Sequence, residues 1–232
     1  MKPVKTLLCV LILGFIMACS KDPLGTNSLK DSRDGKIYEI VKIGNQTWMA
    51  ENLSYLPSVS PSSVRSLTAT VYYVYGYEGN DVASAKQHPN YKVYGVLYNW
   101  DAANVSCPDG WHLPNDEDWK SLELFLGMSE SEANEEGTRD SGSVAKKLKS
   151  TELWDVFGSK GDNSSGFKAI AGAYLDNNGF GNERLGYYCT FWTSSTIGPS
   201  YAWHRFLNYS EDGITRGNYY RNFGHSVRCI KD

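Results

Sequence analysis

Alternating apolar and polar residues predict strands near both ends of the chain. Residues 36–43 are rich in β-branched and aromatic side chains, Gly44-Asn45 is a two-residue hairpin turn, and residues 46–49 return. We expect Trp48 in the second arm to lie in the core. Further apolar segments, separated by turn residues, are residues 191–195, 201–207, 214–219 and 226–230. The pattern predicts an N-terminal β-hairpin and a C-terminal antiparallel meander.

A helical pattern lies in the middle of the chain. Asn115 is a good N-cap because it follows Pro114, and the acidic residues 116–118 place negative charge at the positive end of the helix dipole. The apolar stripe of this helix consists of Trp119, Leu122, Phe125 and Leu126. Gly127 is expected to end the helix.

Shorter patterns complete the predicted fold. Residues 97–104 predict a short helix leading into Cys107. A second helix after the central one is predicted by Val144, Ala145 and Leu148. Residues 161–188 are rich in glycine and asparagine and predict long irregular loops. Two helices between an N-terminal hairpin and a C-terminal meander indicate an α+β domain.

Residues 1–18 predict a lipoprotein signal peptide. A short basic segment precedes an apolar run, residues 7–17, that is too short to span a bilayer, and residues 16–19 have the pattern of a bacterial lipobox. We therefore expect cleavage before Cys19 and attachment of lipid to it, which would hold the protein on a membrane. An ordinary secretory signal that contains a cysteine is the alternative.

Residues 19–30 predict a tether, and residues 31–232 a single domain. The tether contains proline, glycine and asparagine and few apolar residues. Ser20 favours delivery to the outer membrane, and Asp22 favours the cell surface. A net charge of −3 without clustered basic residues argues against a nucleic-acid partner.

The sequence resembles a known family at four places. Residues 107–122, together with residues 94–103 ahead of them, resemble the signature of the Fibrobacter succinogenes major paralogous domain. Residues 31–53 resemble the opening of that domain, and residues 224–232 its closing strand. The family is similar to the C-type-lectin-like superfamily, so the resemblance implies a C-type-lectin-like fold. It also implies a secreted or surface location, but no activity.

The resemblance implies a disulfide bond as well. In C-type-lectin-like domains a cysteine near the first helical region pairs with one in the last strand. These positions correspond to Cys107 and Cys229, which leaves Cys189 free. An extracytoplasmic location permits such a bond. Three buried thiols are the alternative.

The sequence contains no motif of a common catalytic site. HExxH, GxSxG, GxGxxG and the phosphate-binding loop are absent, and the histidines have no metal-ligand spacing. We therefore expect a protein that is not an enzyme. Because formylglycine-generating oxidases share the superfamily and bind copper through a reactive cysteine pair, a related oxidase that uses Cys189 is a further alternative.

Oxygen-bearing side chains in the long loops suggest calcium. Asp162, Asn163 and Asp176 are the candidate ligands, since hard cations bind several carboxylate and amide oxygens. Lectin-like domains bind calcium in the corresponding region. The same residue types are also typical of turns next to glycine. The residue triplets with which calcium-dependent lectins bind sugars are absent.

Ligand contacts are expected in two places. The segment from residue 72 to residue 98 is rich in tyrosine, and Tyr75 and Tyr77 either form an aromatic platform for sugar rings or belong to a half-buried strand pair. In the long loop, the candidate contacts are Asn177, Asn178, Asn182 and Glu183.

Together these features predict a non-catalytic binding module, anchored by lipid at the outer membrane or on the cell surface. Its expected ligands are glycans or envelope proteins. The alternative is a structural envelope or adhesion scaffold that binds no small ligand.

Overall fold

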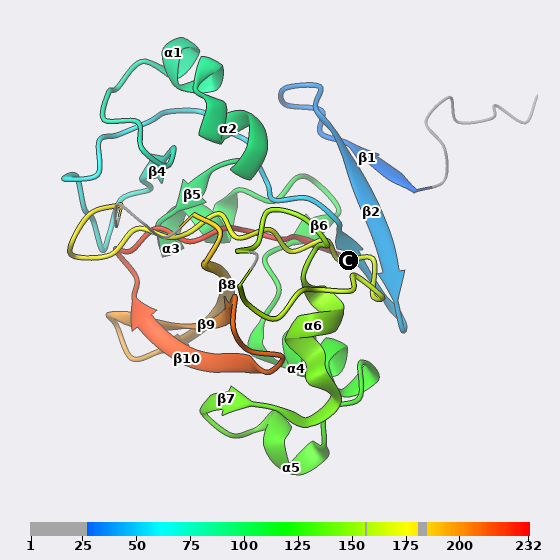
Figure 1. Ribbon diagram of the computed structural model, residues 1–232. Helices are drawn as coiled ribbons and strands as arrows, with labels where there is room; N and C mark the ends of the chain where they lie inside the picture. The colour runs from blue at the N-terminus through cyan, green and yellow to red at the C-terminus, as the bar shows by residue number, and fades with distance from the viewer. Residues whose placement is uncertain (1–26, 156, 181–184) are drawn as a thin grey trace, which may run out of the picture.

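The computed structural model describes residues 27–155, 157–180 and 185–232 (Figure 1). Within these ranges the chain has an α+β fold, with two antiparallel sheets, a two-stranded ribbon and short helices. The predicted signal peptide, Cys19 and residues 20–26 of the predicted tether lie outside the described residues. In the described part, no helix is long and apolar enough to cross a membrane.

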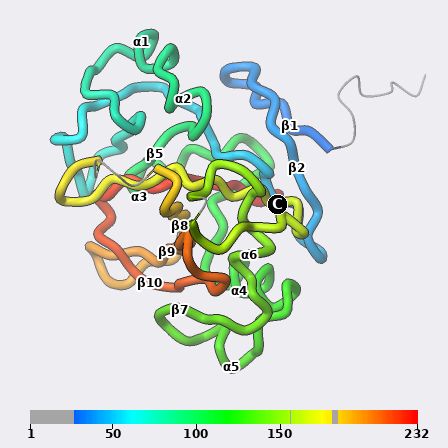
Figure 2. The backbone as a smooth tube through the Cα atoms, in the orientation of Figure 1, coloured from blue at the N-terminus to red at the C-terminus, as the bar shows by residue number. Residues whose placement is uncertain are grey.

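The first sheet joins the two ends of the described chain. Its strands, in spatial order, are β1 (Ser28–Lys30), β2 (Ile37–Ile43), β3 (Gln46–Met49), β11 (Ile230–Lys231) and β6 (Trp111–His112). The first described residues and the C-terminus therefore lie on the same side of the molecule (Figure 2). Strands β2 and β3 form the predicted hairpin, and Trp48 is fully buried, as expected.

The predicted tether is too long by three residues at its C-terminal end. Residues 28–30 form β1 and pair antiparallel with residues 37–39 of β2. The chain can reverse between these strands because the carboxylate of Asp31 accepts hydrogen bonds from the backbone and the guanidinium group of Arg33. The folded region therefore begins before Asp31.

The second sheet is the predicted meander. Its strands, in spatial order, are β7 (Gly137–Arg139), β10 (Ile214–Tyr220), β9 (Tyr201–Asn208) and β8 (Tyr188–Ile197), and all neighbours are antiparallel. The strand predicted at residues 226–230 is reduced to β11 in the first sheet. The reason is that this segment crosses between the sheets. The carbonyl of Ser226 accepts from Trp192 of β8, and that of Cys229 accepts from Met49 of β3.

Two short helices, α1 (Val82–Gln87) and α2 (Pro89–Tyr94), lie at one end of the molecule, and a two-stranded ribbon and a third short helix follow toward its middle (Figure 1). The ribbon consists of β4 (Tyr72–Tyr73) and β5 (Leu97–Tyr98), and the third helix is α3 (Trp100–Val105). The helix predicted at residues 97–104 begins later than expected, because Leu97 and Tyr98 pair with β4. Asn99 then caps α3, and its side chain accepts from the N–H of Ala102.

Helix α4 (Asp116–Phe125) begins as predicted, at the N-cap Asn115. The side chains of Asn115 and Asp118 form a complete capping box. Of the predicted stripe, Trp119, Leu122 and Leu126 are buried, but Phe125 is 63 % exposed. Phe125 lies at the edge of the stripe, where its ring covers Gly44 of the hairpin turn instead of entering the core. The helices α5 (Glu130–Ala133), η1 (Ser141–Ser143) and α6 (Val144–Leu148) follow, and α6 is the predicted second helix.

An aromatic cluster and a disulfide bond join the parts of the fold. Trp48, Trp119, Phe167 and Phe191 form the cluster, with neighbouring ring centroids 5.1–5.8 Å apart. The predicted Cys107–Cys229 bond is confirmed, with a Cα–Cα distance of 5.8 Å. Cys189 is free, as expected, and it is buried.

Candidate functional site

The tyrosine segment does not form an exposed platform. Tyr75 is 8 % exposed, and its hydroxyl donates to the carbonyl of Phe180 at 3.2 Å. Tyr77 is half-buried, and its hydroxyl donates to the carbonyl of Asp81 at 3.0 Å. The prediction of Tyr75 and Tyr77 as stacking residues is therefore wrong for Tyr75 and has no support at Tyr77. The alternative interpretation, a strand pair, describes β4 and β5 correctly.

The candidate calcium ligands are turn residues. The side chains of Asp162, Asn163 and Asp176 accept from the backbone N–H groups of Ser164, Lys168 and Asn178, at 2.8–2.9 Å. Such bonds are what Asp and Asn contribute to turns. In the described ranges, no three His, Cys, Asp or Glu side chains are grouped so that they could hold a metal ion.

The other predicted loop contacts are only partly described. Asn177 and Asn178 are exposed, at a turn where the backbone N–H of Asn178 bonds the carboxylate of Asp176. Asn182 and Glu183 lie outside the described residues.

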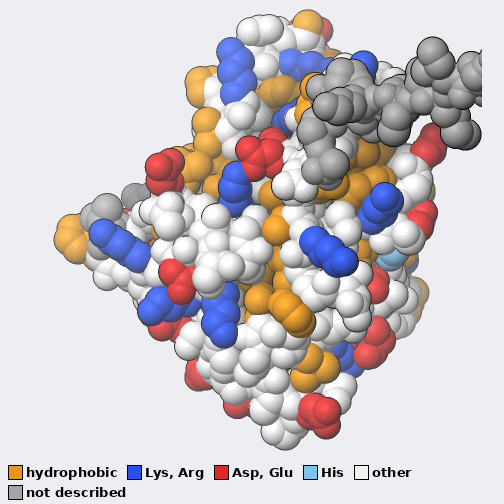
Figure 3. Space-filling view, turned by 90° about the vertical axis from the view of Figure 1, so that its right-hand side faces the viewer, with side chains coloured by type: hydrophobic (Ala, Val, Ile, Leu, Met, Phe, Trp, Pro, Cys, Tyr) orange, Lys and Arg blue, Asp and Glu red, His pale blue; other side chains and the backbone are white. Residues whose placement is uncertain are grey.

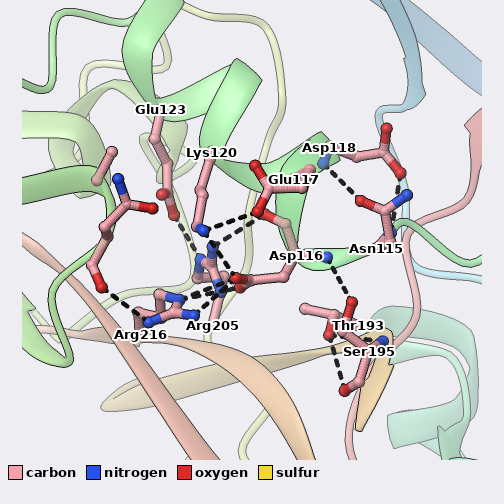
Figure 4. Close-up of polar contacts among 12 residues, drawn as sticks. Asn115, Asp116, Glu117, Asp118, Lys120, Glu123, Thr193, Ser195, Arg205 and Arg216 are labelled. Carbon is pink, nitrogen blue, oxygen red and sulfur yellow. Dashed lines mark hydrogen bonds and ion pairs between the residues drawn. The ribbon is translucent and has the colours of Figure 1, made fainter. Parts of the chain in front are cut away.

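The densest cluster of charged side chains lies between α4 and the second sheet (Figure 4). Asp116 accepts from Arg205 of β9 and from Arg216 of β10, both at 2.8 Å. Glu123, two turns along α4, accepts from Arg205 and, through both carboxylate oxygens, from Arg139 of β7. Each of these side chains is less than 10 % exposed.

This ionic network is closed, so its role is structural. Burial would raise the pKa of Asp116, but the hydrogen bonds and charges of Arg216 and Arg205 outweigh it and hold the pKa well below its usual range. Every side-chain nitrogen and oxygen in the network that is fully buried has a hydrogen-bond partner. No group remains free to bind a ligand or transfer a proton. The network fastens α4 to strands β7, β9 and β10.

The surroundings of Cys189 are not those of a reactive cysteine. It is fully buried, and burial raises the pKa of its thiol to about 12. Cys107 and Cys229 are bonded to each other. Among the described residues, the cysteine pair that a formylglycine-generating oxidase needs is therefore not formed.

The second sheet has one partly open face. Along β9, Arg205 and Leu207 point toward α4 and the core, so the alternate residues His204 and Phe206 point to the opposite face. A hollow of about 300 Å³ opens there. It is lined by His204, Phe206, Thr215, Gly217, Asn218 and Tyr219.

Aromatic rings surround this hollow and support one another. Tyr219 stacks on His204 with 4.4 Å between ring centroids, and Phe206 stacks on Tyr188 at 5.2 Å. The ring of Tyr174, from the long loop, lies 6.2 Å from Tyr219 and 6.4 Å from Phe206. Phe206 and Tyr219 are each half-buried, so part of each side chain is open to solvent.

A polar group stands beside the rings. The hydroxyl of Thr215 lies on the same face of the sheet as Phe206 and bonds that of Thr138, at 3.0 Å. The side chain of Asn218 points to the opposite face, because it alternates with Gly217 and Tyr219 and shares the face of Arg216. Gly217 has no side chain to fill the hollow, and a Cβ there would lie 3.1 Å from Cε1 of His204. The hollow therefore offers aromatic surface and a hydroxyl.

Two buried histidines lie beneath the hollow. His204 is 4 % exposed and His225 is fully buried, with 5.5 Å between their ring centroids. His225 stacks on Trp192 at 3.9 Å. None of the four ring nitrogens has a hydrogen-bond partner in the described part of the chain. Burial, together with the charge of Arg205, lowers the pKa of His204 to about 3, so its ring is neutral at physiological pH.

Comparison with known protein families identifies the domain. Residues 41–231 match the model of the Fibrobacter succinogenes major domain. The chain belongs to this family. Comparison with curated proteins and with solved structures gave no match. The family description names neither a ligand nor a reaction.

The Fibrobacter succinogenes major domain of this chain contains both the ionic network and the hollow. The match runs from β2 to β11, and β1 precedes it. Sequence reasoning missed the hollow because it weighed the tyrosine segment and the long loop instead. The pattern that could have found it is the alternation of His204 and Phe206 on β9 with Thr215, Gly217 and Tyr219 on β10.

Proposed function

We propose that this protein is a non-catalytic, glycan-binding module, anchored by lipid in the bacterial outer membrane and exposed on the cell surface. The observation that supports the proposal best is the hollow on the open face of the second sheet. Half-buried Phe206 and Tyr219 stand there beside the hydroxyl of Thr215. Ligand sites are concave and mostly apolar, with a few polar groups that fix orientation, and this hollow has that composition.

The chemistry of the hollow suits a sugar better than a flat protein surface. The apolar face of a pyranose ring packs against an aromatic ring, while its hydroxyl groups require amide or hydroxyl partners. Phe206 and Tyr219 supply the rings, and the hydroxyl of Thr215 supplies a partner. Because no acidic side chain lines the hollow, we expect binding that does not require calcium.

The fold and location are part of the same proposal. An α+β fold with both ends of the chain in one sheet, and a disulfide from the first helical region to the last strand, is consistent with a C-type-lectin-like domain. The lipobox ending at Cys19 supports the lipid anchor. A scaffold without a small ligand is the alternative, and it leaves the open aromatic hollow unexplained.

A glycan array tests the proposal. The purified full-length protein, in a mild detergent, would be screened in calcium and again in chelator. We expect selective binding that survives chelation. Replacing Thr215 by Val keeps the shape of the side chain but removes its hydroxyl and one or two neutral hydrogen bonds, so we expect affinity for the selected glycan to fall about three- to tenfold.

Matched variants separate the hollow from the long loop. Phe206→Leu keeps an apolar side chain in place but removes the ring, and should weaken binding as well. Asn178→Ala changes an exposed amide in the long loop and should leave affinity unchanged. Absence of selective binding both in calcium and in chelator would favour the scaffold. Loss of binding in chelator would instead favour a calcium site in the acidic loops.

A further inference from the structure

A second concave region lies away from the hollow, between α2, the end of β3 and the segment that follows α6. It consists of two adjoining cavities of about 220 and 320 Å³, which share Leu153, Lys168 and Ile170. We call it the basic groove. Its lining also includes Lys36, Glu51, Asn52, Lys92, Tyr94 and Arg228 at one end. At the other end it includes Ser150, Thr151, Glu152 and Asn163.

Arg228, beneath the basic groove, is a buried cation without a carboxylate partner. It is 1 % exposed, and its guanidinium group donates to Asn52 Oδ1 and to the carbonyls of Met49, Phe167 and Lys168, at 2.6–3.2 Å. These acceptors are all neutral. By contrast, a carboxylate is bonded by each of Arg33, Arg139, Arg205, Arg216 and Arg221. A buried charge is normally paired with an opposite charge, whereas the nearby carboxylate of Glu51 acts on Arg228 without a hydrogen bond to it.

Two lysines add to this positive charge at the surface. Lys36 is half-buried, with its ammonium group 4.8 Å from the ring centroid of Tyr38, and Lys92 is exposed. Neither makes an ion pair within the described ranges, whereas Lys168 is paired with Glu39. At this end of the basic groove, the one carboxylate in the lining is Glu51, so positive charge exceeds negative.

Part of the remaining lining is apolar, and some of its backbone angles are unusual. Tyr94, Leu153 and Ile170 form the apolar wall, and Leu153 is 44 % exposed. Three non-glycine residues of the lining have left-handed backbone angles, with φ of 64° at Leu153, 50° at Asn163 and 55° at Lys168. Such strain persists only where the surrounding structure imposes it, and it concentrates at ligand sites.

We propose that the basic groove is a second ligand site, separate from the hollow, and that it binds a uronic acid residue of an acidic glycan. The carboxylate of the sugar lies against Lys36 and Lys92 and adds negative charge near Arg228. The ring lies on Tyr94 and Leu153. Glu51 accepts hydrogen bonds from the sugar hydroxyls. On the side of the molecule that includes β2, basic and apolar side chains lie next to one another (Figure 3).

Competing anions fit this site less well. The guanidinium nitrogens of Arg228 already donate to protein oxygens, so Arg228 cannot bind a phosphate through two parallel hydrogen bonds. A doubly charged phosphate would also be repelled by Glu51. An acidic peptide would need partners for its backbone amides, but the side chain of Asn52 is already bonded to Tyr94 and Arg228. A singly charged ligand with hydroxyl groups meets all of these conditions.

Calorimetric titration of the full-length protein, in non-ionic detergent at low salt, tests this proposal. The probe is oligogalacturonate, and its fully methyl-esterified form is the matched neutral ligand. We expect the ester to bind at least about tenfold more weakly, and binding of the acid to weaken as salt is raised. Changing Lys36 and Lys92 together to Gln should lower affinity for the acid by a similar factor, because these cations meet its carboxylate.

The controls separate this site from the hollow and from general charge effects. Lys42→Gln removes the same charge from an exposed position on β2 and should not change affinity. Thr215→Val, in the hollow, should also have no effect on oligogalacturonate. Equal binding of acid and ester, equal loss in Lys42→Gln, or no binding of the acid would overturn the proposal. Tighter binding of hexaglutamate than of oligogalacturonate would overturn the assignment to a sugar.

Discussion

A terminal nitrogen of Arg205 donates to the carboxylate of Asp116 at 2.8 Å, across 89 residues of sequence. The bond joins the middle of β9 to the first turn of α4. Asp116 therefore has two roles at once, since it also places negative charge at the positive end of the helix dipole.

Replacing Asp116 by Asn should destabilise the fold strongly. The change leaves the guanidinium groups of Arg205 and Arg216 buried without their shared counter-charge, so the free energy of unfolding should fall by about 3–5 kcal/mol. Denaturant unfolding measures this difference. Glu117→Gln, at a neighbouring side chain that is 78 % exposed, is the matched control and should change stability by less than about 0.5 kcal/mol. Similar small effects of both changes would contradict a structural role for the network.

The buried histidines should make the protein sensitive to acid. The pKa of His204 is lowered from 6.5 to about 3 by burial and by the charge of Arg205, and burial lowers that of His225 as well. As pH falls below 6.5, the unfolded chain takes up protons that the folded chain does not, so stability is lost. Each histidine should cost roughly 2 kcal/mol between pH 6.5 and pH 5.

Unfolding measured at several pH values checks this expectation. His204→Phe keeps a ring stacked on Tyr219 but removes one titrating group, so stability should depend less on pH. Tyr219→Phe alters the same stack without removing a histidine, and should keep the dependence of the wild type. If His204→Phe loses stability with acid as steeply as the wild type does, His204 is not the source.

Cys189 should be inert in the folded protein. Its thiol is fully buried, and burial raises its pKa to about 12, so almost no thiolate is present at neutral pH. Iodoacetamide should therefore leave Cys189 unlabelled in native protein and label it in denaturant, as mass spectrometry can show. Rapid labelling of the native protein would revive the interpretation of Cys189 as a reactive residue.

Reducing the Cys107–Cys229 bond should lower stability substantially. The bond links residues 122 positions apart, and a loop of this length corresponds to about 4–5 kcal/mol in the chain-entropy model. Denaturant unfolding of the Cys107→Ser, Cys229→Ser double variant measures the effect. Cys189→Ala, which removes a sulfur but no bond, should cost much less. Equal losses of stability in the double variant and in Cys189→Ala would show that the disulfide contributes nothing beyond the packing of its sulfur atoms.

Sequence predicted the parts of the fold that depend on local chemistry. Gly44-Asn45 identified the hairpin turn, and Asn115 with Asp118 identified the start of α4, because turn and capping geometry need only neighbouring residues. The disulfide followed from family resemblance instead. Phe125 was misplaced because helical spacing gives the stripe but not its exact width.

The candidate sites could not be predicted in the same way. Burial of Tyr75 depends on Phe180, more than a hundred residues away, and the neutral surroundings of Arg228 depend on acceptors from two distant segments, residues 49–52 and 167–168. The same is true of Asp116, whose helix position was correct but whose arginine partners were unforeseen. Contacts of this kind are set by sheet pairing, and the sequence pattern does not specify that pairing.

The disulfide also determines how the molecule responds to mechanical tension. With the chain held at its N-terminus and a ligand held on β10, the shortest covalent path for the force runs from Cys107 through the disulfide to Cys229 and back toward β10. Helix α4 and its ionic network lie on the longer arm of the closed loop, outside this path. A pull on the ligand would therefore pass along the covalent chain through the segment between β10 and β11, and would reach α4 only through the ion pairs of Asp116 and Glu123.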